Sequence, residues 1–341
     1  MQRRRKNWAR YDDDRLLDLR LCDLDLKIER TPLGPPIDRL YDELEQRNIR
    51  HKPHVWLSNE WFSPDGVPGI ALPFYLAHPR LRKLEQKKML EVEGGTEGEC
   101  RRILRHEAGH AIDTAYRLHR RKRWREIFGS FSQPYPNSYK PKPNSRNYVV
   151  HLAAWYAQAH PAEDFAETFA VWLTPRSRWR KRYKNWYAAL RKLEYVDELM
   201  QEIAGRPAPV RSRAQIYPLK DLRLTLRQHY RKKRAHYGVE WDEYYDRDLA
   251  RLFSNDKQHA ARPTAASFLR GIRKDIRERI AEWTGAHTYT VDQVLQDMID
   301  RSREKKLRLA MPINRARQEA MMLVTVHTMH CMHWTHREIP L

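Results

Sequence analysis

The feature that most constrains this chain is the pentapeptide His106-Glu-Ala-Gly-His110, which matches the pattern H-E-x-x-H. The capping-box sequence Thr96-Glu-Gly-Glu99 precedes it and predicts the start of a helix that runs to about Arg120. Two histidines four residues apart share one face of a helix, so both imidazoles can reach a single zinc ion. Glu107 between them can then take a proton from the water that such an ion activates.

A third ligand decides what kind of zinc site this is, because a catalytic zinc typically has three protein ligands and one open position. The metzincin pattern is excluded, since it needs Gly at position 113 and His at position 116, where this chain has Asp113 and Tyr116. Glu163-Asp-Phe-Ala-Glu167 places two carboxylates one turn apart on a second predicted helix, from Pro161 to just before Thr174-Pro175. One glutamate could bind zinc while the other accepts a hydrogen bond from a ligand histidine. The alternative is that both carboxylates only stabilise the start of the helix.

Together these motifs resemble the gluzincin arrangement, in which H-E-x-x-H is followed by E-x-x-x-D/E on a later helix. The run from Tyr156 to Ala170 is similar in particular to the lethal-factor-like branch and to bacterial zinc-binding metallopeptidases that have no assigned substrate. The resemblance covers about residues 50–205. It implies that Glu163 is the metal ligand and that Glu167 supports a ligand histidine.

The resemblance also implies a reaction, the zinc-dependent hydrolysis of peptide bonds in a peptide or protein substrate. The cofactor would be Zn²⁺, held by His106, His110 and Glu163. Glu107 would act as general base, and Tyr156 would donate a hydrogen bond to the developing oxyanion. His160 competes for this last role, although its position before Pro161 also suits a simple helix start.

The predicted fold class is α+β and mainly α, with a zincin-like catalytic domain, a small N-terminal sheet and a C-terminal helical region. Alternating apolar and polar residues within 16–30 predict a strand. Val55-Trp-Leu and Ile70 to Leu76 are further predicted strands, and Pro73 places the second at a sheet edge. A short amphipathic helix is predicted from Ile37 to Gln46.

The predicted domains follow from shifts in composition along the chain. They are a metallopeptidase domain at 1–205 (an α/β part at 1–95, active-site helices at 96–120 and 161–173), a linker at 206–213 and a basic helical domain of unknown role at 214–341. Within the last, helical periods lie near 218–236, 241–253, 264–283, 291–308 and 314–332, the fourth opened by a second capping box at Thr290-Val-Asp-Gln293. The proline-rich stretch 129–146 is predicted to be a long loop, which could act as a lid.

Charge is concentrated around these motifs. The chain has 65 Lys and Arg against 44 Asp and Glu, a net +21. From Arg101 to Arg191 there are 19 basic and six acidic residues, a net +13, which leaves +8 for the rest. The excess could be a solvated helix face, or it could create a positive field that favours acidic peptides or proteins held on nucleic acid.

Two other classes of function remain open. One is a basic nucleic-acid-associated or protein-interaction protein with a structural or vestigial zinc site, in which Trp179, Trp186 and Tyr187 could stack on bases rather than fill a core. The other is a non-catalytic scaffold, which the presence of Glu107 disfavours. The tail from His327 to His336 invites a second metal site, but steps of three residues turn these two histidines to opposite sides of a helix.

Neither a membrane span nor an export signal is predicted, and the expected location is the cytoplasm. The longest apolar stretch, Gly69 to Ala77, is far shorter than the ~20 residues of a spanning helix. Three cysteines, Cys22, Cys100 and Cys331, are too few and too scattered for a disulfide framework. Cys100 is predicted to be a small buried apolar residue.

Overall fold

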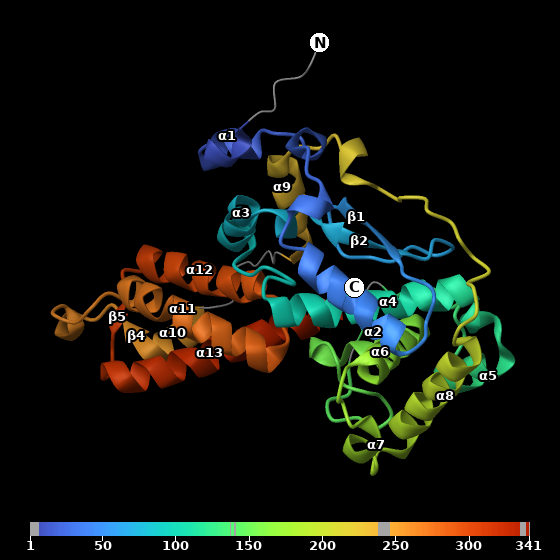
Figure 1. The fold of residues 1–341 in the computed structure, drawn as a ribbon. Coiled ribbons are helices and arrows are strands. Elements are labelled where there is room, and N and C mark those ends of the chain that lie inside the picture. Colours follow the sequence, from blue (N-terminus) through green and yellow to red (C-terminus); the bar gives the residue numbers. More distant parts are fainter. Residues whose placement is uncertain (1–6, 137, 140, 238–245, 335–338, 341) are drawn as a thin grey trace. The chain divides into compact units, whose positions relative to one another are not determined.

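The computed structural model describes residues 7–136, 138–139, 141–237, 246–334 and 339–340. It is mainly helical with short two-stranded sheets, in agreement with the predicted mainly α class (Figure 1). The chain folds into two compact units. The first consists of residues 1–88 and 92–229, and the second of residues 89–91 and 230–340.

The elements of the first unit lie in the order α1 (Asp13–Leu17), α2 (Gly34–Gln46), β1 (His54–Ser58), β2 (Gly69–Pro73), α3 (Pro79–Met89), α4 (Glu97–Tyr116), α5 (Lys122–Phe128), β3 (Ser138–Tyr139), α6 (Pro161–Leu173), α7 (Trp179–Arg182) and α8 (Tyr187–Ile203). Helix α9 (Leu226–Tyr237) begins in the first unit and ends in the second. The second unit continues with α10 (Asp246–Leu252), β4 (Phe253–Ser254), α11 (Ala265–Thr284), α12 (Thr288–Glu304), β5 (Arg308–Leu309), α13 (Ile313–Trp334) and β6 (Ile339–Pro340).

Helices α4 and α6 form the centre of the first unit. Helix α4 starts as predicted, with the Thr96 side chain accepting a hydrogen bond from the Glu99 N–H at 3.2 Å. It ends at Tyr116, earlier than predicted, because Arg117 adopts a left-handed backbone with φ 53°. Helix α6 has the predicted bounds, and every residue from Pro161 to Leu173 is buried.

Helices α4 and α6 approach each other closely at Gly109, which has no side chain. A Cβ atom on Gly109 would lie 2.7 Å from the Ala166 Cα and 3.1 Å from the Ala166 carbonyl oxygen. Ala166 is flanked on its own helix by Glu163 and Glu167. The absence of a side chain at Gly109 therefore lets α6 bring both carboxylates up to the histidines of α4.

We expect Gly109→Ala to push the helices apart and to destabilise the first unit by about 1–3 kcal/mol, the usual cost of overpacking. Alanine otherwise favours a helix over glycine by about 1 kcal/mol, so a net loss identifies the clash. Gly98→Ala is the matched control, since a Cβ on this other glycine of α4 meets nothing within 4 Å. Urea unfolding of both variants checks the prediction, which a stabilised Gly109→Ala protein would contradict.

Two buried ion pairs hold neighbouring helices onto this centre. Arg105 on α4 binds the Glu43 carboxylate of α2 through two hydrogen bonds of 2.7 Å each. Lys192 on α8 binds Asp164 on α6 at 2.6 Å. Each buried charge thus lies beside an opposite charge, which offsets part of the cost of removing it from water.

The small sheet is parallel, with His54 of β1 opposite Gly69 of β2. The predicted first strand is confirmed, while the second ends at Pro73 and continues as a 3-10 helix over Phe74–Ala77. Beyond β1, the backbone of Ala71 also pairs with Phe62, the N–H donating at 2.8 Å. Pro73 is thus the last residue of the strand, where a missing N–H is tolerated.

The strand predicted within residues 16–30 is wrong. This segment holds the end of α1 and two 3-10 turns, Leu21–Leu24 and Ile28–Arg30. Leu19, Leu21 and Leu24 are buried, but a strand also needs a continuous ladder, and here only Arg20 forms a bridge, with Thr225.

Residues 222–226 belong to the first unit because their backbone bonds to this N-terminal segment. The Leu21 N–H donates to the Leu224 carbonyl at 3.0 Å and the Leu226 N–H donates to the Leu19 carbonyl at 2.9 Å. The division between the units therefore falls at 229–230. This is beyond the predicted linker 206–213, whose role as a domain boundary stays a prediction.

In the second unit α11, α12 and α13 pack pairwise around a core that includes Leu269, Val294 and Met298 (Figure 1). The predicted capping box at Thr290 is wrong, because α12 begins three residues earlier, with His287 rather than Thr290 as its N-cap. The Thr290 hydroxyl instead donates to the Tyr237 carbonyl at 2.6 Å.

Asp297 on α12 makes the stability of this unit depend on pH. Burial, and then the charge of Asp300, raise its pKa from 3.8 to about 6. Because the pKa is higher in the folded state, the protonated carboxyl stabilises the folded state fully at a pH below the unfolded-state pKa of 3.8. This stabilisation is lost as the pH rises to about 6. We expect Asp297→Asn to stabilise the protein by about 1–2 kcal/mol at pH 7.5 and by less than half as much at pH 4.5. Urea midpoints at the two pH values check this, and an equal effect at both would contradict it.

No helix in the described ranges is long and apolar enough to cross a membrane. Cys100 is buried as predicted, and burial raises the pKa of its thiol to about 11.

Candidate metal centre

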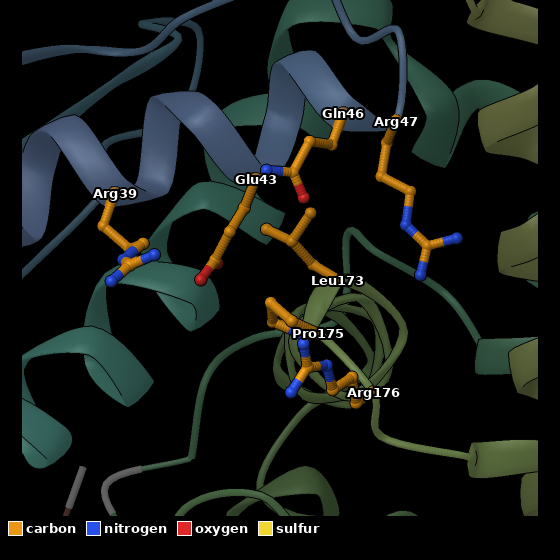
Figure 2. A pocket seen from close by; sticks show the side chains of 7 residues that line it. All are labelled: Arg39, Glu43, Gln46, Arg47, Leu173, Pro175 and Arg176. Atoms are coloured by element: carbon orange, nitrogen blue, oxygen red, sulfur yellow. The ribbon is translucent and has the colours of Figure 1, made fainter.

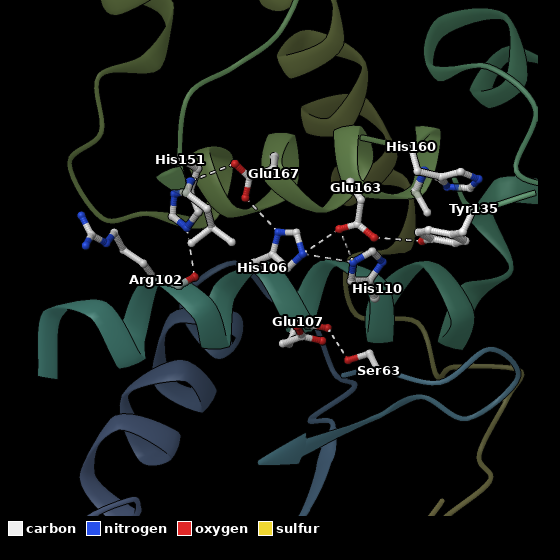
Figure 3. Close-up of polar contacts among 12 residues, drawn as sticks. Ser63, Arg102, His106, Glu107, His110, Tyr135, His151, His160, Glu163 and Glu167 are labelled. Carbon is white, nitrogen blue, oxygen red and sulfur yellow. Dashed lines mark hydrogen bonds and ion pairs between the residues drawn. The ribbon is translucent and has the colours of Figure 1, made fainter. Parts of the chain in front are cut away.

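Three of the predicted ligand side chains converge between α4 and α6 (Figure 3). The His106 Nε2 lies 3.0 Å from Glu163 Oε2, and the His110 Nε2 lies 3.2 Å from the same oxygen. The two histidine nitrogens are 3.2 Å apart. Two lone-pair nitrogens and a carboxylate oxygen thus point at one position, as the spacing of the motifs predicts.

Glu167 orients the first histidine. The His106 Nδ1–H donates to Glu167 Oε1 at 2.8 Å, so Nε2 is the nitrogen that faces Glu163 and that could bind a metal ion once its proton is displaced. The other oxygen of Glu167 accepts the Leu152 N–H at 2.8 Å. Glu163 thus contacts the Nε2 atoms of both histidines, whereas Glu167 contacts only the Nδ1 atom of His106.

The arrangement fits zinc. Ligand atoms 2.0–2.1 Å from a tetrahedral zinc ion lie about 3.3 Å from one another, close to the separations of the three atoms here. Two imidazoles and one carboxylate are also a ligand set that catalytic zinc sites use. The His110 side chain is partly exposed, whereas His106 and Glu163 are buried, so the site can be reached from solvent on the His110 side.

The electrostatics of the three residues are those of a tight ion-paired cluster. Burial lowers the pKa of His106, but the hydrogen bonds that its ring donates to Glu163 and Glu167 outweigh this and hold the pKa well above its ordinary value. Burial raises the pKa of Glu163, yet the charges of His110 and His106 bring it well below the usual range. Glu163 is therefore ionised, and a bound cation would take the place of protons on the histidines.

Glu107 is buried on α4 beside Ser63, whose hydroxyl donates to the Glu107 backbone carbonyl at 3.0 Å (Figure 3). Burial raises the pKa of its carboxyl, and the charges of His106 and His110 only partly offset this. Its Oε2 has no hydrogen-bond partner among the described residues. A buried carboxylate oxygen without a partner is costly and suits a group that exchanges protons with a ligand or water.

Tyr156 lies against the first ligand histidine, with ring centroids 5.4 Å apart. It follows Ala154 and Trp155, whose φ values of 58° and 52° are rare for residues other than glycine. Burial, and then the charge of Glu163, raise the pKa of Tyr156 well above its ordinary value, so its hydroxyl stays protonated.

His160, the competing residue, has both ring nitrogens engaged with the backbone. Nδ1 accepts the Ala162 N–H at 3.1 Å, which makes His160 the N-cap of α6. Nε2 donates to the Gln133 carbonyl at 3.0 Å. Neither nitrogen is available to donate to a substrate without breaking one of these bonds.

Tyr135 is a site residue that the motifs do not indicate. It lies in the predicted loop 129–146, and its hydroxyl donates to Glu163 Oε1 at 2.9 Å (Figure 3). Its ring stacks on His160 with centroids 3.8 Å apart. Nothing in the pattern Pro134-Tyr-Pro136 signals this contact, because the loop reaches Glu163 only after folding.

Part of the basic charge near these motifs is paired. Arg121 and Arg123 on and beside α5 bind Glu202 and Glu198 of α8. Arg180 binds Asp197 and lies over the buried ring of Trp179, which fills the core rather than offering a stacking surface. Tyr187, in contrast, is 81% exposed.

The histidine-rich tail gives no second cluster of three potential ligands within the described ranges. His327 is buried and bonds to Asp248 at 3.0 Å. His336 lies outside the described residues, so the second-site hypothesis is not tested at that end.

Comparison with known proteins supports a metal-dependent peptidase. Residues 77–196, about a third of the chain, match a family described as "putative zinc-binding metallo-peptidase". The matched segment contains both motif helices and all the site residues from His106 to Glu167. No curated protein and no solved structure is significantly similar to the chain. The description of the matched family thus names zinc as the metal and peptides or proteins as the class of substrate.

Proposed function

We propose that this protein is a zinc-dependent metallopeptidase of the gluzincin type with a zincin-like catalytic domain. The observation that carries the proposal is that the potential ligand atoms of His106, His110 and Glu163 all lie within 4.8 Å of one another. The match of residues 77–196 to a zinc-binding metallopeptidase family supports it independently.

The ligands would be His106 Nε2, His110 Nε2 and the Glu163 carboxylate. When bound there, zinc supplies Lewis acidity, which polarises a peptide carbonyl and lowers the pKa of water. Glu167 keeps His106 in the tautomer that this role needs, and Tyr135 holds the second oxygen of Glu163. The chain thereby orients two of the three proposed ligands.

Glu107 is the general base of the proposed reaction. Its buried carboxylate accepts a proton from the attacking water and then delivers it to the nitrogen of the leaving amine. The raised pKa that burial imposes suits both steps, because the group must gain and lose a proton within one turnover. Tyr156 donates a hydrogen bond from its hydroxyl to the oxyanion that develops on the carbonyl oxygen.

The proposed substrate is a peptide or protein, and an acidic one is favoured by the net +13 between Arg101 and Arg191. A direct test incubates the zinc-loaded protein with a peptide library and identifies new N-termini by mass spectrometry. We expect cleavage that 1,10-phenanthroline abolishes and added zinc restores. Cleavage that persists after complete removal of zinc would contradict the proposal.

Tyr156→Phe separates a catalytic tyrosine from one that only supports the site. We expect kcat to fall about 10²–10³-fold while zinc affinity stays unchanged, because the lost hydrogen bond forms in the transition state. Tyr135→Phe is the matched variant, and it should weaken zinc affinity about 10–100-fold while zinc-saturated kcat stays close to wild type. Zinc titration combined with kinetics at saturating zinc checks both, and an unchanged kcat in Tyr156→Phe would remove this tyrosine from the mechanism.

A further inference from the structure

A hollow of the first unit lies away from the metal centre, between α2 and the end of α6 (Figure 2). Its volume is about 650 Å³, within the range of about 300–1,000 Å³ typical of small-molecule sites. Leu173 on its wall is ten residues beyond Glu163 on α6, a distance of about 15 Å along the helix axis. The hollow is therefore a separate place from the proposed zinc site.

The charges around the hollow are three arginines and one carboxylate. Glu43 is buried, and both of its oxygens are bound by Arg105, so its charge is already neutralised. Arg39, Arg47 and Arg176 line the hollow, and none of them has an ion-pair partner in the described part of the chain. Three positive charges thus surround a space that holds no uncompensated negative charge.

The fold holds the side chain of one arginine and sets the backbone conformation of another. The Arg47 guanidinium donates to the Trp172 carbonyl at 3.2 Å and lies over the Trp172 ring at 4.6 Å. Arg176 follows the end of α6 with φ 56°, a left-handed backbone that turns the chain back after the helix. In Figure 2, Arg39 and Arg47 flank Glu43 along α2, and Arg176 faces them from the other side of the hollow.

We propose that this hollow binds a small polyanion that carries a chain of phosphate groups. Guanidinium groups are planar forks that bind phosphate oxygens through paired hydrogen bonds, and they remain charged at every physiological pH. Three guanidinium groups around one hollow suit a ligand with several phosphates better than a ligand with a single carboxylate. Gln46 adds a neutral donor, while Leu173 and Pro175 form an apolar wall that an organic group attached to the phosphates can contact.

Binding of inorganic tripolyphosphate to the full-length, zinc-loaded protein tests the proposal by calorimetry at 0.15 M salt. The variant Arg39→Gln/Arg176→Gln removes two charges from the hollow. The matched control Arg178→Gln/Lys181→Gln removes two exposed charges that do not line it. Chelation of zinc by the probe would be the same in all three proteins, so differences between them report on the hollow.

We expect saturable 1:1 binding to the wild type, a Kd raised at least about tenfold in the hollow variant and a change below about threefold in the control. A nucleoside triphosphate as a second probe tells the two sources of phosphate apart, since tighter binding than tripolyphosphate indicates contact with the apolar wall. Absence of saturable binding would overturn the proposal. An equal loss in both variants would also overturn it, because attraction would then depend on overall charge alone.

Discussion

Replacing Glu107 by Gln is expected to reduce kcat for peptide hydrolysis by about 10²–10⁴-fold, the usual contribution of a general base. Glutamine has nearly the same shape but cannot accept and pass on a proton. Its side chain can still fill the space beside Ser63, so α4 should keep its position and the two ligand histidines their geometry. Kinetics with a peptide found by the library experiment, at saturating zinc, measures the effect.

The informative comparison is between turnover and metal content. We expect Glu107→Gln to bind zinc as tightly as the wild type, since Glu107 is not among the three converging ligand side chains. Full activity in this variant would exclude Glu107 as the base. Loss of zinc together with activity would mean that Glu107 is needed for zinc binding rather than for proton transfer.

Replacing Glu163 by Ala is expected to weaken zinc affinity about a thousandfold or more, because it removes one of three protein ligands. It also removes the carboxylate that pairs with both histidines, so His110 would lose this partner, while His106 would keep only Glu167. Competition for zinc with a chromogenic chelator measures the affinity of the wild type and of the variant under the same conditions.

Glu167→Ala is the matched control, four residues further on the same helix. Glu167 touches only the far nitrogen of His106 and the Leu152 N–H, so its loss should cost about 10–100-fold in zinc affinity. The order of the two losses identifies which glutamate is the ligand. A larger loss in Glu167→Ala than in Glu163→Ala would reverse this assignment.

The parts of the site that could be predicted from the sequence are those set by spacing along one helix. His106 and His110 share a face of α4, and Glu163 and Glu167 share a face of α6, because four residues make about one turn. The helix start at Thr96 and the bounds of α6 can also be predicted from the sequence, because they depend on local signals, namely capping residues and proline.

What the sequence could not show depends on contacts between distant segments. Tyr135 reaches Glu163 from a loop, and the residues between them carry no periodic pattern that would bring the two together. The role of Gly109 is visible only once Ala166 lies against it. The error at residues 16–30 has the same origin, because the alternating leucines are buried by turns that bond to residues 222–226 instead of by a sheet.

The central claim is that His106, His110 and Glu163 together hold one zinc ion. Crystals of the zinc-loaded protein, measured on both sides of the zinc absorption edge, locate every zinc atom directly. We predict a single strong anomalous peak about 2.0–2.2 Å from His106 Nε2, His110 Nε2 and a carboxylate oxygen of Glu163. A peak at any other set of side chains, or none between α4 and α6 at saturating zinc, would contradict it.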